Sequence, residues 1–154
     1  MIGYAGRAGA GALARANREQ LAGVFPAGIL SVAARKGPSF PVPDRLAVLS
    51  RVRLGEGGVL RGLWILGEKL QCGLDVEIGK VLLRQEDVEV CEMFGADLYR
   101  IDAGGGWLIA VRNAQDALRV LQQMEIPSSV IGSTTTGRRR TVWMGDMPRY
   151  LEGP

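Results

Sequence analysis

The stretch GEGGVLRGLWILGEKLQCGLDVEI, residues 55–78, decides the fold of this chain. Its opening glycines indicate a tight turn, and the apolar residues that follow recur at helical spacing, which predicts a helix over 59–70. Gly73 is typical of the residue that follows a helix. From Leu74 to Ile78 apolar and polar side chains then alternate, as they do in a half-buried strand. The chain therefore combines helices and strands within a short distance.

The sequence after this stretch continues in the same way. We predict a helix over 85–94, a central strand over 107–111 and a helix over 114–124 that Asn113 caps. Strands follow over 129–132 and 141–144, separated by a turn over 134–138, and the tail 147–154 is extended. This order predicts an α+β fold, in which helices cover a mixed β-sheet.

The sequence before the stretch is less regular. Apolar spacing predicts helices over 9–24 and 27–35, and Asp44 is a suitable cap for a third helix over 45–49. A short strand is expected over 52–54. No low-complexity linker divides the chain, so residues 1–154 are interpreted as a single domain with a helical part over 1–54.

Composition excludes several classes of function. The 154 residues are 47% hydrophobic and 23% charged, with a net charge of +3, which is typical of a globular protein and too weak to indicate nucleic-acid binding. There is no histidine, which excludes catalytic triads, Cys–His pairs and histidine–zinc sites within this chain. No apolar run predicts a membrane span, so a cytoplasmic protein is expected. Cys72 and Cys91 are expected to be inert core thiols. Arg138, Arg139 and Arg140 are interpreted as a solvated turn, with anion attraction as the alternative.

The order of motifs over about a hundred residues resembles a known family. The motifs are Gly55–Leu60, Leu63-Trp64, Gly73–Val76, Arg84–Val88, Cys91-Glu92, Phe94, Asp97–Tyr99, a glycine cluster, Leu108–Val111 and Ile126–Gly132. They are similar to the C-terminal domain shared by aminoimidazole ribonucleotide (AIR) synthase, formylglycinamidine ribonucleotide synthase, selenophosphate synthase, thiamine monophosphate kinase and the hydrogenase-maturation carbamoyl dehydratase. The resemblance is greatest to AIR synthase-related proteins of anaerobic bacteria. It is strong over 55–152 and weaker over 1–54.

Departures from the family pattern limit what the resemblance implies. Family members place a His-Asp pair just before the glycine stretch, where this chain has Val52-Arg53. They also carry an N-terminal domain that binds ATP and magnesium, which this sequence lacks. The resemblance therefore implies no catalytic residue and no cofactor here, and ATP and magnesium only if a separate chain of the N-terminal type is present.

Two sets of residues are the candidate sites. Gly55, Glu56, Gly57 and Gly58, flanked by Arg53 and Arg61, are the candidate site for an anion such as phosphate or sulfate, because the family has its interdomain cleft there and a helix start favours negative charge. The alternative is a plain turn with Arg61 in solvent. Leu63 and Trp64 are candidate partner contacts, since a domain without its neighbour exposes an apolar face.

Two other polar clusters are interpreted as structural. Glu86, Asp87, Glu89 and Glu92 are interpreted as dipole partners of a helix rather than as magnesium ligands. Gly104–Gly106 is interpreted as a turn, since it lacks the lysine of a phosphate-binding loop.

Three functions remain open from the sequence. The preferred hypothesis is a non-catalytic accessory or binding module, which forms a homo-oligomer or binds a protein partner in place of the missing N-terminal domain, or binds a small anion. The second is one half of a split ATP-dependent enzyme. The third is a small-molecule sensor that uses the helix start at Gly55–Gly58.

Overall fold

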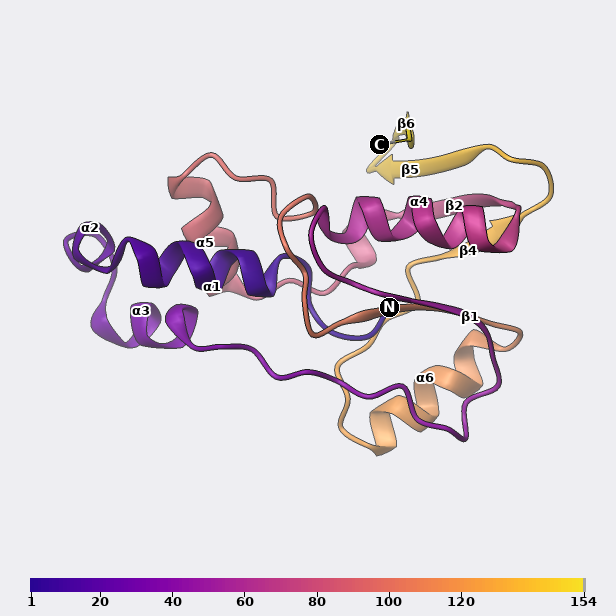
Figure 1. The fold of residues 1–154 in the computed structure, drawn as a ribbon, viewed down its shortest axis with the longest axis horizontal. Helices are drawn as coiled ribbons and strands as arrows, with labels where there is room; N and C mark the ends of the chain where they lie inside the picture. The colour runs from indigo at the N-terminus through magenta and orange to yellow at the C-terminus, as the bar shows by residue number, and fades with distance from the viewer. Residues whose placement is uncertain (154) are drawn as a thin grey trace.

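The computed structural model describes residues 1–153, in which three helical elements come first and a mixed α/β arrangement follows (Figure 1). The helices are α1 (Arg7–Ala16), α2 (Arg18–Ala22), α3 (Ala27–Ala34), α4 (Gly58–Leu70), α5 (Gln85–Met93) and α6 (Ala114–Gln123), with a 3₁₀ turn at Ile78–Lys80. The strands are β1 (Val48–Arg53), β2 (Gly73–Glu77), β3 (Trp107–Val111), β4 (Gly132–Thr135), β5 (Arg140–Met144) and β6 (Met147–Tyr150).

The strands form two sheets. β1 pairs antiparallel with β3, and the second sheet has the order β4-β2-β5-β6. Within it β2 is parallel to β5, whereas the β2–β4 and β5–β6 pairs are antiparallel. The predicted α+β class with a mixed sheet is confirmed.

The β1–β3 sheet is covered on both faces. Leu108 and Ala110 pack in one apolar cluster with residues of α4, whereas Ile109 and Val111 pack in another with Ala117 and Leu121 of α6. This alternation follows from the two-residue period of a strand. Helix α4 approaches closely, because a Cβ at Gly62 would lie 2.5 Å from a methyl group of Leu54.

The helices α1, α2, α3 and α5 pack on one another away from the sheets, in the indigo and rose part of Figure 1. Their apolar cluster contains Ala14, Leu21, Leu30, Ala33 and Val90, all buried. The helical interpretation of the N-terminal part is therefore correct in its general form.

Several predicted boundaries are wrong. The helix expected over 9–24 is two helices, because the backbone of Asn17 is not helical and its side-chain amide donates to the carbonyl of Leu13 at 2.9 Å. The helix expected over 45–49 does not form, since Val48 already pairs with Val111 of β3. Strand 107–111 is an end strand and not a central one.

The last part of the chain also differs from expectation. The strand expected over 129–132 begins at Gly132, and Thr134 and Thr135, expected in a turn, belong to β4. Only glycine fits at 132, because a Cβ there would lie 2.2 Å from the carbonyl oxygen of Asp75 on β2. Arg140 is not in a solvated turn, since it opens β5 and is 5% exposed.

Candidate functional site

The glycine stretch forms the turn between β1 and α4. Gly57 and Gly58 both adopt positive φ angles, 82° and 66°, which side chains rarely tolerate. A Cβ on Gly58 would lie 2.4 Å from the carbonyl oxygen of Tyr99 and 2.6 Å from that of Ile101. The glycine at 58 therefore allows close approach to another segment of the same chain.

Three of the first four backbone N–H groups of α4 have partners within the chain. Gly58 N–H donates to the carbonyl of Gly55 at 3.0 Å, and Leu60 N–H donates to that of Tyr99 at 3.2 Å. Arg61 N–H donates to Gly57 at 3.3 Å. An anion beside this turn would therefore depend on side chains rather than on these donors.

The structure separates the residues that the sequence grouped. The guanidinium of Arg53 lies over the Trp107 ring at 6.0 Å. Leu63 is 2% exposed, in the core. Gly55 and Glu56 do not line a cavity among those described, whereas Gly57, Arg61 and Trp64 line the same one. These three share one face of α4 because they are spaced by four and three residues.

That cavity, which we call the α4–β6 cavity, has a volume of about 880 Å³ and lies between α4 and the end of the chain. Its other lining residues come from the 97–100 segment, β5, β6 and the tail, and include Leu60, Asp97, Tyr99, Arg100, Met144, Arg149, Tyr150 and Glu152. The sequence did not indicate the contribution of β6, because nothing in the tail marks it as a neighbour of α4.

Trp64 is held beside this cavity by the buried side chain of Arg140. The guanidinium of Arg140 lies 4.4 Å from the centre of the Trp64 ring and 2.7 Å from a carboxylate oxygen of Glu68. A Cβ at Gly67 would lie 2.4 Å from Nε of Arg140, so only glycine allows this position. The tail packs on the other side, where a Cβ at Gly153 would lie 3.0 Å from the indole of Trp64.

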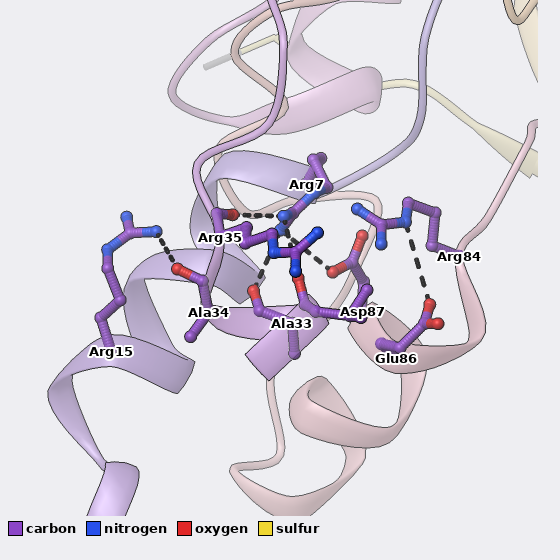
Figure 2. Close-up of polar contacts among 9 residues, drawn as sticks. Arg7, Arg15, Ala33, Ala34, Arg35, Arg84, Glu86 and Asp87 are labelled. Atoms are coloured by element: carbon purple, nitrogen blue, oxygen red, sulfur yellow. Dashed lines mark hydrogen bonds and ion pairs between the residues drawn. The ribbon is translucent and has the colours of Figure 1, made fainter. Parts of the chain in front are cut away.

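A charged cluster joins the helices at the other end of the molecule (Figure 2). Arg7 opens α1 and donates to Asp87 of α5 at 3.3 Å and to the carbonyl of Ala33 in α3 at 3.2 Å. It also donates to the carbonyls of Val32 and Arg35. Arg7 and Asp87 are 4% and 0% exposed. Nε of Arg7 and Oδ2 of Asp87 have no partner in the described chain.

Burial controls the ionisation of this cluster. It raises the pKa of Asp87 to about 6, against the opposing effect of the Arg7 charge, and it lowers the pKa of Arg7. Asp87 lies in the first turn of α5, as its interpretation as a dipole partner requires, and it is also buried against Arg7, which the sequence did not indicate. Over residues 1–153, no group of three or more histidine, cysteine or acidic side chains is placed to hold a metal ion.

Two further expectations concern the thiols and the membrane. Burial raises the pKa of Cys91 to about 11, which favours the protonated thiol expected of a core cysteine, whereas Cys72 is only partly buried. Among the described helices, none is both long and apolar enough to cross a bilayer.

Comparison with known proteins shows a likeness of fold. No protein-family model and no curated protein matches the sequence. Among solved structures, E. coli HypE, a hydrogenase maturation protein, matches 99% of this chain with a TM-score of 0.71 and 19% identity. Thiamine-monophosphate kinase from Stenotrophomonas maltophilia matches 92% with a TM-score of 0.66 and 18% identity.

The chain spans about half the length of these proteins, 48% in both cases. Other HypE structures with the same likeness are a complex with ATP and a complex with HypF. At such identities the likeness concerns the fold. It supports the sequence-based resemblance to AIR synthase-related proteins at that level.

Proposed function

We propose that this chain is an accessory domain, related to the C-terminal domain of AIR synthase-like proteins, that binds a partner protein through the α4–β6 cavity and has no catalytic activity by itself. One observation carries this proposal. The cavity brings together Trp64, Tyr99, Tyr150, Met144 and three arginines, Arg61, Arg100 and Arg149. Aromatic residues, methionine and arginine are the residues enriched at protein interfaces and their energetic centres.

The charges around the cavity indicate which side chains a partner would carry. Arg100 pairs with Asp97 at 3.3 Å, whereas Arg61 and Arg149 form no ion pair within residues 1–153. A partner segment that carries a carboxylate beside an apolar side chain would pair with these arginines and fill the space over Tyr150. Tyr150 and Met147 are 61% and 63% exposed, so such a segment has apolar surface to cover.

The fold neighbours support a protein partner. HypE, which shares this fold, has been solved in complex with HypF. A free phosphate or sulfate at Gly57 and Arg61 is a narrower form of the same proposal, since the same unpaired arginine would hold it.

A second candidate is one half of a split ATP-dependent enzyme. It is favoured by the half-length coverage of HypE, one structure of which contains ATP. In that case the partner would be an ATP-binding chain, and mixing the two would produce ATP hydrolysis that neither shows alone.

The test is the native mass of the purified chain, alone and after isolation from its own cell extract, by size-exclusion chromatography with light scattering. We expect the wild-type chain to co-purify with one partner protein. The amount of that partner should fall at least tenfold for Arg149→Glu and for Tyr150→Ala. The matched control is Arg119→Glu on α6, whose side chain is 67% exposed and does not line the cavity. A companion retained equally by all variants, or a chain that is alone in every sample, would refute the proposal.

A further inference from the structure

A second cavity lies at the start of α1. It has a volume of about 310 Å³ and is bounded by the start of α1, the loop after α3 and the turn before β3. Arg84, which precedes α5, and Glu125, which follows α6, also line it. None of its residues lines the α4–β6 cavity, and Met1 does not line it either. This space, which we call the Arg84 cavity, is therefore separate from the cavity described above.

Most of the wall of the Arg84 cavity is apolar side chain or backbone. The rings of Tyr4 and Phe40 meet edge to face, with centroids 6.5 Å apart and planes at 61°. Pro38, Pro127 and the glycine turn 104–106 line the cavity as well. Sites for small molecules are mostly apolar, with a few charged or polar groups that fix the orientation of the ligand. The Arg84 cavity has this composition.

Arg84 supplies a cation that has no hydrogen bond. Its side chain is 23% exposed, and its Nε lies 3.8 Å from a carboxylate oxygen of Glu86, beyond hydrogen-bond distance. Over residues 1–153 its guanidinium donates to no acceptor, whereas Arg7, which also lines the cavity, donates to Asp87 and to a carbonyl of α3 (Figure 2). The N–H donors of a guanidinium match a carboxylate, which can accept two of them at once. Arg84 is therefore suited to hold a carboxylate.

Glu125 supplies an anion at an unusual backbone position. It follows α6, is exposed, and has a φ angle of 55°. Glycine or asparagine is the usual residue at a positive φ after a helix, because other side chains are strained there. The carboxylate of Glu125 forms no ion pair over residues 1–153, with Arg84 or with any other residue. A charged side chain at a position that favours glycine, beside a cavity, points to a role in binding.

We propose that the Arg84 cavity binds a free amino acid with an apolar side chain. The carboxylate of the ligand pairs with Arg84, its ammonium group pairs with Glu125, and its side chain packs on Tyr4 and Phe40. Because Arg84 and Glu125 line one cavity without pairing with each other, a ligand that carries both charges satisfies both residues. The inference does not rest on the proposed function, since it concerns neither a partner protein nor the α4–β6 cavity.

Isothermal titration calorimetry on the wild-type chain tests this inference. The probe is L-phenylalanine, and two analogues each lack one charge: phenylalaninamide has no carboxylate, and N-acetyl-L-phenylalanine has no ammonium group. L-phenylalanine should bind, and each analogue should bind at least tenfold more weakly. No binding of L-phenylalanine at millimolar concentration would overturn the proposal, as would equal affinity for either analogue. Acetate that binds as tightly as L-phenylalanine would indicate a simple anion site and would also overturn it.

Variants of the two charged residues complete the test. Arg84→Gln and Glu125→Gln should each weaken the binding of L-phenylalanine at least tenfold, whereas Arg119→Gln, at an exposed site, should leave it unchanged. Glu125→Gly removes the carboxylate and the strain together, so affinity should fall while the melting temperature does not. Full affinity in Arg84→Gln or in either Glu125 variant would overturn the proposal. Tyr150→Ala should keep the affinity, so a failure at the α4–β6 cavity is distinguishable from a failure here.

Discussion

The two buried arginines of this chain stand in opposite environments. Arg7 is 4% exposed and faces Asp87, which is fully buried, whereas Arg140 is 5% exposed and pairs with Glu68, whose side chain is 49% exposed. Arg7 of α1 donates to backbone carbonyls at the end of α3 and to the Asp87 side chain of α5, whereas Arg140 stacks on Trp64 beside an open cavity. Arg7 therefore holds helices together, whereas Arg140 orients Trp64 beside the α4–β6 cavity. Removing the first should therefore cost far more stability.

The largest effect is expected from Arg7→Met. The change leaves the Asp87 carboxylate buried without its counter-ion and leaves three carbonyls without their donor. Loss of one partner of a buried pair costs about 3–5 kcal/mol of the free energy of unfolding. Urea denaturation at pH 7 measures it, with Arg149→Met, at an exposed site, as the control that should change little. A loss no larger than that of the control would show that the cluster is not structural.

The second effect is a pH dependence that belongs to Asp87. Its pKa is about 6 in the folded chain against an ordinary value of 3.8, so the folded state binds more protons between these values. The free energy of unfolding must then fall as the pH rises from about 4 to 7, by about 2–3 kcal/mol from this group. Asp87→Asn does not titrate and should lack this part of the slope. Denaturation of both chains across this range measures it, and parallel curves would contradict it.

The third effect concerns the start of α4. Gly58→Ala places a methyl group against the Tyr99 carbonyl at a positive φ, and should cost about 2 kcal/mol in the free energy of unfolding. Gly28→Ala is the matched control, because nothing lies within 4 Å of its Cβ position and alanine is the better helix former. Thermal denaturation of both compares them. The prediction is wrong if the two variants melt together.

The smallest effect is expected from Arg140→Lys. Lysine keeps the charge but loses the planar group that stacks on Trp64 and reaches Glu68, which should cost about 1 kcal/mol. Arg139→Lys, at an exposed position over Tyr150, is the control and should cost less than half of this. If the two changes proved equal in urea denaturation, Arg140 would not be the residue that positions Trp64.

The elements predicted correctly are those whose sequence pattern lies within the element itself. Helix α4 follows from its apolar spacing and its glycine turn, and α5 and α6 were placed to within one residue at each end. The first part of β1 was missed, because Val48, Ser50 and Arg51 are strand residues only through pairing with β3. That pairing lies far away in the chain and leaves no local pattern.

The candidate site was predicted to the extent that it lies on one helix. Gly57 and Arg61 were predicted as part of an anion site and Trp64 as a separate partner contact, and all three line the same cavity beside α4. Arg149 and Tyr150 join them only in the folded chain. The burial of Asp87 could have been predicted from its spacing. It lies three residues before Val90 and four before Cys91, so all three share the buried face of α5. A charge on that face indicated a buried partner.

The parallel pairing of β2 with β5 has a consequence for how the chain folds. The side chains of Asp75 and Trp143, bonded across this pair, are 68 residues apart in sequence, and the Met1–Ser129 contact spans 128. Contacts between such distant residues require costly loop closure, and slow folding follows. Both edges of β2 stay unpaired until β4 and β5, from the end of the chain, reach them. During that interval the nascent chain is most vulnerable to aggregation.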